Sequence, residues 1–559
     1  MSPDGASSAA RTYDETMTTQ DHGPPPHPGR RRRLLLHLWC ALLSGVVFWP
    51  FLSTLAGHAR PGGSTASLIL RDMVVPHSMA LNDLATGADG LPRAVPQDTV
   101  LAWLSPLVPP PVTVSVLMLL GGYIGALGSV ALVRQVSGGR AGPAAVVAPV
   151  VTLWNPYVAE RLLQGHWSVV LAGVLLPAVA VCAARRPPWT WGVLAALMAV
   201  CALTPTGVIL ATVTAAVASL VGSAPVRKFL VSVGTGAVLT LPWVIPTLLH
   251  AGAAATRTDA AGAALFAARA EPGVGTLGAL AGLGGIWNAD AVPGSRDALA
   301  PVSTGAGVVL ACLAVITAVV LWRRSRLRGA PLVWLALAAV AVPALAATAP
   351  GLAVTGWFLE FVPGAGLVRD SQKFVVLALP GLVVLLGQGL ALLPRGRQVG
   401  AAAVALVLVW VSVPALPRDL ATLAPVQLDS AYDGLADRVS DWQDAHGTTA
   451  RTLLWPPGNY RVVEGRPALD PALKILPGRP VDPGYLIVDG ALVDGDPETV
   501  AALSELASGE DTLAERGVDL VVVEDGTVGT VEDTGARSVL ADHVEIWSSG
   551  RWSLYAVER

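Results

Sequence analysis

The sequence RRRRLLLHLWCALLSGVVFWPFLSTL at residues 30–55 joins four arginines to a long apolar run. The run from Leu34 to Leu55 exceeds the signal-peptide core of about 7–15 residues, and no small-residue cleavage site follows it. Its length suffices to cross a hydrocarbon core of about 30 Å. We therefore expect a permanent membrane span that begins on the cytoplasmic side, after a disordered cytoplasmic tail at residues 1–33.

Similar apolar runs recur along the chain. Hydrophobic residues make up 53% of the sequence and charged residues 14%, and the mean hydropathy is +0.57. Soluble domains have about 25% charged residues, so the composition indicates an α-helical polytopic membrane protein. We expect about eleven transmembrane helices between residues 34 and 416, at 34–56, 112–134, 143–157, 168–184, 190–204, 206–222, 229–250, 304–322, 331–348, 374–393 and 399–416.

Basic residues fall on alternate connections between these spans. The clusters are Arg30–Arg33, Arg134 with Arg140, Arg185–Arg186, Arg227–Lys228, Arg323–Arg328 and Arg395 with Arg397. The positive-inside rule assigns all of them to the cytoplasm. It predicts a multi-pass plasma-membrane protein with a cytoplasmic N-terminus and an extracytoplasmic C-terminus.

The same topology exports two long loops, 57–111 and 251–303, and the tail 417–559. The tail carries 25 acidic and 11 basic residues, which suits a soluble domain far better than nucleic-acid binding, so no nucleic-acid partner is expected. Within it, strands are expected at Arg451–Trp455, Tyr485–Val488 and Asp519–Val523, a hairpin at 544–557 and a helix at Pro497–Gly517. We therefore predict a small extracytoplasmic α/β domain.

The first outer loop contains Leu68-Ile-Leu-Arg-Asp-Met-Val-Val-Pro-His77. A carboxylate within such an apolar stretch near lipid requires a raised proton affinity or a partner. Asp72 is therefore a candidate general base, although an ion pair with Arg71 is the simpler interpretation. His77 is a weaker candidate ligand contact, since a lone histidine more often makes a structural hydrogen bond.

Two further outer segments carry candidate substrate-binding residues. Glu160, Arg161 and His166 lie in a short turn between spans and suit a polyol and its phosphate, although a local Glu–Arg ion pair would also explain them. Arg369 and Lys373 stand four residues apart at an expected helix entry, a spacing that suits a phosphate head group. Cations that snorkel to the interface are the competing interpretation.

Several function classes find no support in the sequence. It contains no Walker A loop, no Gly-x-Ser-x-Gly, no His-Glu-x-x-His and no dinucleotide fingerprint after a strand. The absence of an ATP-binding motif argues against a primary pump. The expected spans contain almost no charge, which argues against an ion-coupled transporter.

The layout resembles the GT-C superfamily, integral-membrane glycosyltransferases that use polyprenyl-phosphate-linked sugars, and more narrowly the YfhO-type and actinobacterial arabinofuranosyltransferase-like members. The similarity is carried by the stretch 70–77, by Arg369-Asp-Ser-Gln-Lys-Phe374, which is similar to an Arg-(Asp/Glu)-Pro-x-Lys-Phe element, and by the tail pattern 513–523. Ser371 departs from the proline of that element. Asp72 is a single acid and not an adjacent pair, which leaves the need for a divalent cation open.

The resemblance implies a membrane-bound glycosyltransferase of the cell envelope. A sugar would pass from a polyprenyl-phosphate donor to a glycan or lipid acceptor on the outer face. Asp72 would act as the catalytic base, and Arg369 and Lys373 would bind the lipid phosphate. The alternatives are a non-catalytic scaffold or lipid- or glycan-handling protein of the same architecture and, with less support, a facilitative transporter.

Overall fold

The computed structural model describes residues 28–60, 65–88, 94–139, 141–185, 189–221, 224–249, 260–362, 364–458, 460–481, 486–488, 491–493, 497–526 and 534–558. Most of the tail predicted to be disordered, residues 1–27, lies outside this set. The last residues of that predicted tail are helical, because helix α1 (Pro28–Val47) already begins at Pro28. Proline is favoured at the first helical position, where its missing N–H is not needed.

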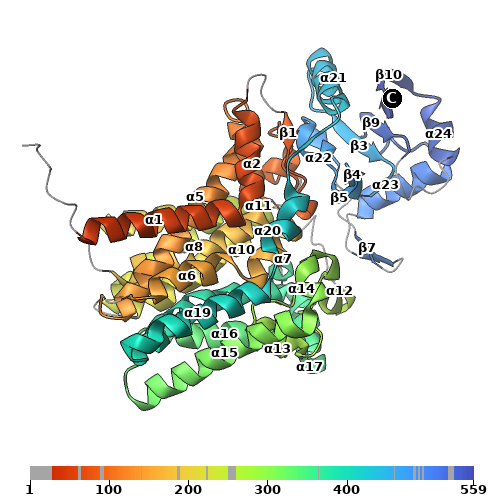
Figure 1. Ribbon diagram of the computed structural model, residues 1–559. Helices are drawn as coiled ribbons and strands as arrows, with labels where there is room; N and C mark the ends of the chain where they lie inside the picture. The colour runs from red at the N-terminus through yellow and green to blue at the C-terminus, as the bar shows by residue number, and fades with distance from the viewer. Residues whose placement is uncertain are drawn as a thin grey trace, which may run out of the picture.

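Most of the chain forms one helical bundle (Figure 1). Its members are α1, α2 (Trp49–His58), α5 (Pro110–Val136), α6 (Ala144–Leu153), α8 (Trp167–Ala184), α9 (Trp189–Cys201), α10 (Pro205–Ser219), α11 (Pro225–Leu249), α15 (Ala300–Arg323), α16 (Ala330–Ala346), α17 (Ala349–Phe361), α18 (Leu379–Leu392) and α19 (Arg395–Ser412). Helix α8 lies at the centre, since 94% of its most apolar window is buried, against 11% for α11.

Six helices of the described chain are long and apolar enough to cross a membrane, and eight if each of two bent pairs forms one span. The structure therefore supports a membrane protein with fewer clear spans than predicted. Helices also cover the predicted ranges 143–157, 190–204 and 206–222, but α6, α9 and α10 have 10, 13 and 15 residues. A perpendicular crossing takes about 20 residues.

Glycine determines how the central helices meet. Gly121, Gly125 and Gly128 lie on the face of α5 that packs against α8. A Cβ at Gly125 would lie 2.1 Å from the Val174 carbonyl oxygen, and one at Gly128 would lie 2.6 Å from the Ala178 Cα. Apolar side chains gain little from helix contact in lipid, so close backbone approach at small residues is what stabilises the pair.

Two helix pairs bend sharply. The α1–α2 pair turns by 85° and the α16–α17 pair by 90°. Pro50 and Pro350 stand in the first turns of α2 and α17. Proline has no amide hydrogen, and its ring clashes with the carbonyl four residues earlier, so neither α1 nor α16 can continue unbroken past these points.

The connections between the bundle helices, and the segment that leads to the C-terminal unit (residues 426–558), form short elements. They are β1 (Ala66–Ser67), η1 (Arg71–Met73), α3 (Asp83–Thr86), α4 (Gln97–Leu104), α7 (Pro156–Leu163), α12 (Ala260–Leu265), α13 (Gly275–Ala281), η2 (Ala289–Ala291), α14 (Gly294–Ala298), η3 (Ala365–Val368), η4 (Ser371–Ala378), α20 (Leu416–Asp419) and η5 (Leu420–Leu423).

The C-terminal unit is built on a five-stranded sheet with the strand order β10-β11-β9-β3-β6. Strand β3 is parallel to β6 and β9, and the remaining pairs are antiparallel. The sheet strands are β3 (Arg451–Trp455), β6 (Arg479–Pro480), β9 (Leu520–Glu524), β10 (Val544–Ser549) and β11 (Trp552–Ala556). The smaller pairs combine β2 (Val426–Gln427) with β1, β4 (Tyr460–Val463) with β5 (Arg466–Leu469), and β7 (Leu486–Val488) with β8 (Ala491–Val493).

Helices cover both faces of this sheet. Leu454 and Val522 pack with α21 (Ala431–His446) and α22 (Ala472–Ile475) on one face. Leu453 and Val521 pack with α23 (Pro497–Ser508) and α24 (Thr534–Leu540) on the other. The split follows the two-residue period of a strand, which sends neighbouring side chains to opposite faces.

The predicted strand at Arg451–Trp455 and the terminal hairpin are confirmed, and β9 lies one residue beyond its predicted start. The predicted strand at 485–488 is described only from Leu486. The predicted helix at 497–517 is wrong in its extent. It ends at Ser508, because Gly509 adopts a left-handed conformation with φ +88°.

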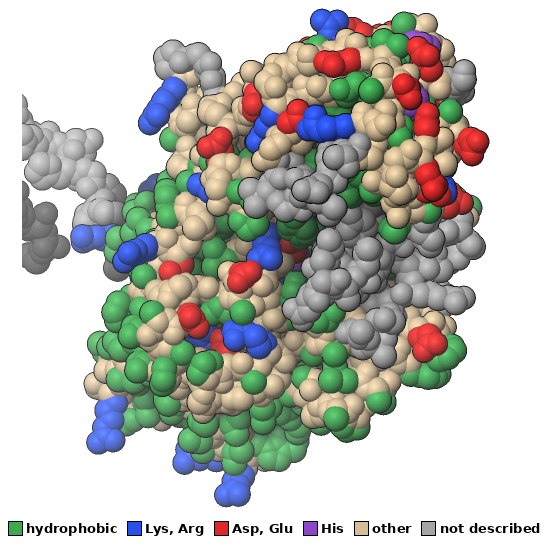
Figure 2. Space-filling model, turned by 90° about the vertical axis from the view of Figure 1, so that its right-hand side faces the viewer, with side chains coloured by type: hydrophobic (Ala, Val, Ile, Leu, Met, Phe, Trp, Pro, Cys, Tyr) green, Lys and Arg blue, Asp and Glu red, His purple; other side chains and the backbone are tan. Residues whose placement is uncertain are grey.

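The connection between α2 and α5 docks on the C-terminal unit. Asn82 donates hydrogen bonds to the carbonyls of Leu473 and Leu476, both at 2.9 Å. Lys474 forms a buried ion pair with Asp98 at 2.9 Å. Figure 2 shows acidic side chains gathered mostly over the upper part of the molecule, where this unit lies, above a largely hydrophobic lower part.

Candidate functional site

Asp72 lies in the single 3₁₀ turn η1, and its apolar neighbours hold that turn between two cores. Leu70 and Val75 are buried in the main core of the bundle. Ile69 and Val74 pack instead with Val463 and Ala468 of the β4–β5 hairpin. The apolar stretch therefore buries itself in protein, and it fixes the Asp72 carboxylate at the junction of bundle and C-terminal unit.

Four polar side chains surround the Asp72 carboxylate. Its Oδ2 accepts a hydrogen bond from Gln164 Nε2 at 2.7 Å and lies 3.2 Å from His166 Nε2. Its Oδ1 accepts a hydrogen bond from the Tyr460 hydroxyl at 2.7 Å. Arg71 Nε, the partner expected from sequence, lies 3.8 Å from Oδ1.

These contacts determine the protonation of Asp72. Burial acts to raise its pKa, but the hydrogen bond and charge of His166 and the hydrogen bonds of Gln164 and Tyr460 outweigh burial. The pKa of Asp72 therefore lies below its ordinary value. Of the two expectations for this carboxylate, the structure supports a set of partners and not a raised proton affinity.

Gly165 allows the turn between α7 and α8 to reach η1. It adopts φ +97°, and a Cβ there would lie 2.5 Å from the Leu70 carbonyl oxygen. The Asp72 amide donates a hydrogen bond to the Gln164 carbonyl at 3.2 Å. A side chain at position 165 would push this backbone contact apart, so glycine is required for both reasons.

Arg161 orients His166. Arg161 Nη1 lies 3.3 Å from His166 Nδ1, and a guanidinium can only donate. This contact holds the imidazole so that its other nitrogen, Nε2, faces Asp72.

Arg161 is itself fixed by the segment after η3. It is fully buried, and it donates to both Asp370 oxygens, at 2.5 and 2.8 Å, and to the Gln372 side chain. Burial acts to raise the pKa of Asp370, but the charge and hydrogen bonds of Arg161, with further charge from Lys373 and His166, hold it below its ordinary value. A chain of polar contacts thus runs from Asp72 through His166 and Arg161 to Asp370.

Glu160 belongs to a second buried group. Its Oε2 accepts a hydrogen bond from the Ile286 amide at 3.1 Å, and its Oε1 lies 4.0 Å from Arg296 Nε. Arg296 forms its close ion pair with Glu271, at 2.5 Å. Burial and the charge of Glu271 raise the pKa of Glu160 to about 8.

The local Glu160–Arg161 ion pair considered from sequence is therefore not the arrangement found. The two side chains lie at 0% exposure and take different charged partners, Glu160 on the Arg296 side and Arg161 on Asp370, while the Gln372 side chain contacts both. Helical geometry explains the divergence, because neighbouring helix residues point about 100° apart and cannot face each other. Because both side chains are fully buried, their role in the structure is to hold the neighbouring residues in place.

Arg369 and Lys373 do not share a helical face. The expected helix entry is a 3₁₀ segment that starts only at Ser371, so Arg369 precedes it. The Arg369 guanidinium carbon lies 4.1 Å from the ring centre of Phe266, and the Lys373 amine lies 5.7 Å from that of Phe374. Both cations nevertheless flank Asp370. Arg369 precedes it in the sequence, and the charge of Lys373 acts to lower the pKa of Asp370.

His77 joins a different interface. Its Nε2 lies 2.8 Å from Asp433 on α21, and its amide donates to the Ser67 hydroxyl. It therefore fastens the connection between α2 and α5 to the C-terminal unit. This is the structural hydrogen-bonding role that was the simpler interpretation of the sequence.

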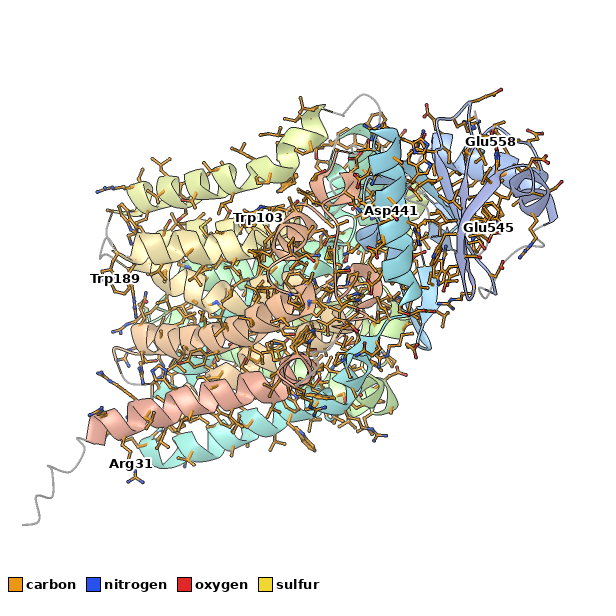
Figure 3. The ribbon with its side chains drawn as sticks, turned by 90° about the horizontal axis from the view of Figure 1, so that it is seen from above. Arg31, Trp103, Trp189, Asp441, Glu545 and Glu558 are labelled. Atoms are coloured by element: carbon orange, nitrogen blue, oxygen red, sulfur yellow. The ribbon has the colours of Figure 1, made fainter. Side chains whose placement is uncertain are left out.

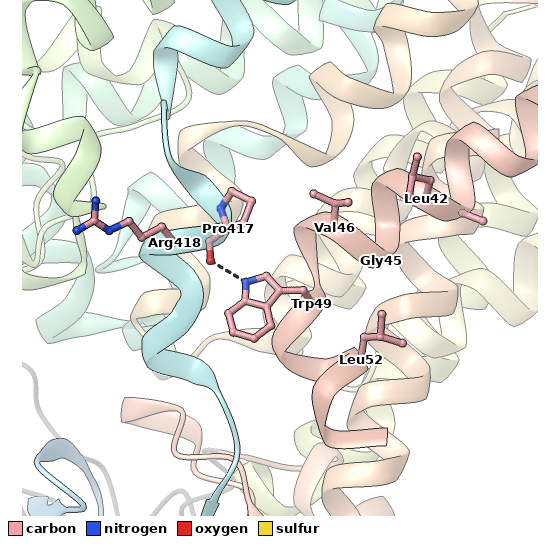
Figure 4. Close-up of a pocket in the computed structure, with 8 residues that line it drawn as sticks. Leu42, Gly45, Val46, Trp49, Leu52, Pro417 and Arg418 are labelled. Carbon is pink, nitrogen blue, oxygen red and sulfur yellow. Dashed lines mark hydrogen bonds between the residues drawn. The ribbon is translucent and has the colours of Figure 1, made fainter. Parts of the chain in front are cut away.

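An open apolar groove of about 620 Å³ lies on another part of the surface, at the α1–α2 bend (Figure 4). Trp49 closes one side by donating from Nε1 to the Pro417 carbonyl at 2.6 Å. The groove is lined by Ala41, Leu42, Gly45, Val46, Trp49, Leu52, Pro417 and Arg418. Its lining shares no residue with the Asp72 contacts described above.

Within the described ranges, no group of three or more His, Cys, Asp or Glu side chains is placed to hold a metal ion. Neither a protein-family model nor a curated protein matches the chain. The chemistry of the site therefore has to be argued from its own residues.

Four partners in the site were not singled out from the sequence. Three of them, Gln164, Asp370 and Gln372, lie within the two candidate segments 160–166 and 369–374. Their residue types alone do not mark them as site residues. Tyr460 lies 388 residues from Asp72, and only the fold brings the two together. The one feature that could have indicated this contact is the set of apolar residues in the β4–β5 hairpin, which pack against the apolar stretch 68–75.

Proposed function

We propose that this protein is a membrane glycosyltransferase that moves a sugar from a polyprenyl-phosphate donor to a cell-envelope glycan or lipid acceptor on the outer face. The observation that carries the proposal is the Asp72 carboxylate, ionised and held by Gln164 and His166 at the junction of bundle and C-terminal unit. The chain of contacts from it ends at Asp370, which lies between Arg369 and Lys373. A base and a pair of cations are the parts that such a transfer requires.

The roles follow from the chemistry of each group. Asp72 takes the proton of the acceptor hydroxyl while the hydroxyl oxygen bonds to the anomeric carbon of the donor. The bond from that carbon to the phosphate oxygen breaks, and the electron pair leaves with the polyprenyl phosphate. Arg369 and Lys373 stabilise the charge that develops there. Glu160, Arg161 and His166 hold the framework on which these groups stand.

We further infer about eleven spans, a cytoplasmic N-terminus and an extracytoplasmic C-terminal unit in the plasma membrane. Contacts among the basic connections support a common side. Lys228 donates to the Ala184 carbonyl at 3.0 Å, and Arg328 Nη1 lies 3.5 Å from the Val136 carbonyl oxygen. Arg31 and Trp189 lie at the end of the bundle opposite Asp441, Glu545 and Glu558 (Figure 3).

One observation favours a non-catalytic protein of the same architecture. Asp72 is well supplied with hydrogen bonds, and its low pKa makes it a weak base. A carboxylate in that state can serve as a structural link between η1, the α7–α8 turn and the C-terminal unit. Under this alternative, the same contacts would stabilise a lipid- or glycan-handling surface without turnover.

Transfer assays with purified protein in lipid nanodiscs separate the two functions. Arabinofuranose and mannose linked to polyprenyl phosphate serve as donors, and alkyl glycosides serve as acceptors. We expect Asp72→Asn to lower kcat by roughly 10²–10⁴-fold, because it removes the proton acceptor and keeps the shape. We expect Arg369→Ala to lower it by roughly 10²-fold through the leaving phosphate.

Asp441→Asn is the matched control, because Asp441 is an exposed partner of Arg438 on α21. It should leave transfer unchanged. Full activity of Asp72→Asn would overturn the assignment of the base. Absence of transfer by the wild type with all donors would favour the non-catalytic alternative.

A further inference from the structure

The C-terminal unit contributes a side chain to the Asp72 site. Tyr460 opens strand β4, and its hydroxyl donates to Asp72 Oδ1 at 2.7 Å. The β4–β5 hairpin that carries it packs Val463 and Ala468 on the η1 loop. This unit is therefore part of the wall around the carboxylate.

The hairpin backbone is firmly held. Arg461, next to Tyr460, is buried and pairs with Glu524 at 2.9 Å and with Asp470 at 3.2 Å. Arg466 Nη1 donates to the Ala424 carbonyl at 2.7 Å. The Tyr460 residue, by contrast, is 36% exposed, so its side chain can rotate away while the backbone stays in place.

The two oxygens of Asp72 differ in what holds them. Oδ2 is bound by Gln164, which is 1% exposed and is itself held by Asn288 at 2.7 Å, and by His166. Oδ1 accepts a hydrogen bond from the Tyr460 hydroxyl, and Arg71 Nε lies 3.8 Å from it. The hydrogen bonds of Gln164 and His166 thus go to one oxygen, whereas the other oxygen is bound by a partly exposed hydroxyl with a cation beside it.

An alcohol hydroxyl of a sugar is the same kind of donor as the Tyr460 hydroxyl. We propose that Tyr460 occupies the place of the acceptor hydroxyl on Asp72, and that a glycan acceptor reaches Asp72 at the Tyr460 end of the β4–β5 hairpin by displacing the Tyr460 side chain. This inference rests on the proposed glycosyl transfer. It makes the C-terminal unit one wall of the acceptor site.

The displacement leaves the chemistry balanced. The acceptor hydroxyl takes over the hydrogen bond to Oδ1 and then transfers its proton to that oxygen. Its oxygen forms the bond to the anomeric carbon, and the polyprenyl phosphate leaves. Tyr460 takes no part in forming or breaking a bond. It competes with the acceptor hydroxyl for the hydrogen bond to Asp72 Oδ1.

Steady-state kinetics of Tyr460→Phe test the competition. The variant keeps the ring and loses the hydroxyl, so we expect the acceptor KM to fall by roughly three- to tenfold with kcat within about twofold. Tyr432→Phe is the matched control, because Tyr432 is 2% exposed in the core of the same unit. A Tyr460→Phe KM that is unchanged or raised, with or without a lower Tm, would overturn the proposal.

A second readout does not depend on turnover. With 3-fluorotyrosine at position 460, the ¹⁹F resonance should shift and saturate on titration with an alkyl glycoside that serves as acceptor. The 3-fluorotyrosine-labelled Asp72→Asn variant should show a smaller shift. If the wild type transfers sugar but the resonance does not move, the proposed displacement of Tyr460 is wrong and the proposed glycosyl transfer stands. If no variant transfers sugar, the proposed function fails, and the titration alone decides whether a glycoside displaces Tyr460.

Discussion

At the scale of single residues, burial and partner choice decide the chemistry of each charged group. Asp72 and Glu160 are both carboxylates near the junction, yet their pKa values move in opposite directions. Asp72 faces three hydrogen-bond donors, which outweigh its burial. Glu160 faces burial and a second carboxylate, Glu271, with one arginine between them.

The raised pKa of Glu160 predicts a pH-dependent stability. The folded protein keeps a proton on Glu160 up to about pH 8, whereas the unfolded chain loses it near the ordinary value of 4.5. Between these values the unfolded state binds fewer protons, so this group lowers stability as pH rises. Glu160→Gln has no proton to lose, and the variant should gain Tm relative to wild type between about pH 5 and pH 8.

Thermal unfolding in detergent across that pH range measures the effect. Glu545→Gln makes the same change on an exposed strand residue and should leave the pH profile as in the wild type. A Tm difference between Glu160→Gln and wild type that stays constant with pH would contradict the assignment.

At the scale of elements, contacts set the local helix type and the helix spacing. The spacing of Arg369 and Lys373 predicts an α-helical face, but the segment from Ser371 is a 3₁₀ helix. Arg161 explains part of this outcome, since it binds Asp370 and Gln372 from the neighbouring α7 and fixes the start of the segment. The i,i+4 rule applies only where the backbone is α-helical.

The α5–α8 contact predicts a strong response to a single methyl group. Gly125→Ala would place a Cβ 2.1 Å from the Val174 carbonyl oxygen, so the helices must separate. We expect a loss of about 2 kcal/mol or more, seen as lower Tm and lower yield of monodisperse protein. Gly192→Ala on α9 is the matched control, since its Cβ would meet no described atom within 4 Å.

The control should be neutral or slightly stabilising, because alanine is favoured over glycine in a helix interior by about 1 kcal/mol. Equal effects of the two substitutions would show that the glycine face of α5 has no special role in packing.

At the scale of the whole molecule, the acidic C-terminal unit and the basic connections of the bundle lie far apart. Arg31 and Trp189 mark one end, and Asp441, Glu545 and Glu558 mark the other (Figure 3). This separation is what the positive-inside rule requires of a protein whose C-terminal unit is exported. The orientation can therefore be tested with two surface positions.

Single cysteines at Gln135 and Ala445, in a variant that lacks Cys40, Cys182, Cys201 and Cys312, report the side of the membrane. A membrane-impermeant maleimide added to intact cells should label Ala445→Cys on α21. It should label Gln135→Cys beside Arg134 only after the cells are opened. The reverse pattern would overturn the proposed orientation.

The membrane class, the basic connections and the change of composition near residue 417 could be predicted from the sequence. These properties depend on the length and charge of continuous segments, so each can be read from one segment without knowledge of its neighbours in the fold. Strands such as Arg451–Trp455 were also predictable, because alternation and β-branched or aromatic residues act locally. The candidate site was predictable only as a set of separate segments that connect the expected spans.

Tertiary structure alone decided which of those segments meet and in what state. Residues as distant as Asp72, Arg161, Asp370 and Tyr460 become partners through packing of the hairpin on η1 and of α7 on the 370–372 segment. Their protonation follows from those partners, because the free energy of ionising a buried group depends on the groups that surround it and not on its place in the sequence. The sequence by itself determined that the chain crosses a membrane, whereas the fold decided that Asp72 is an ionised carboxylate shared between the bundle and the C-terminal unit.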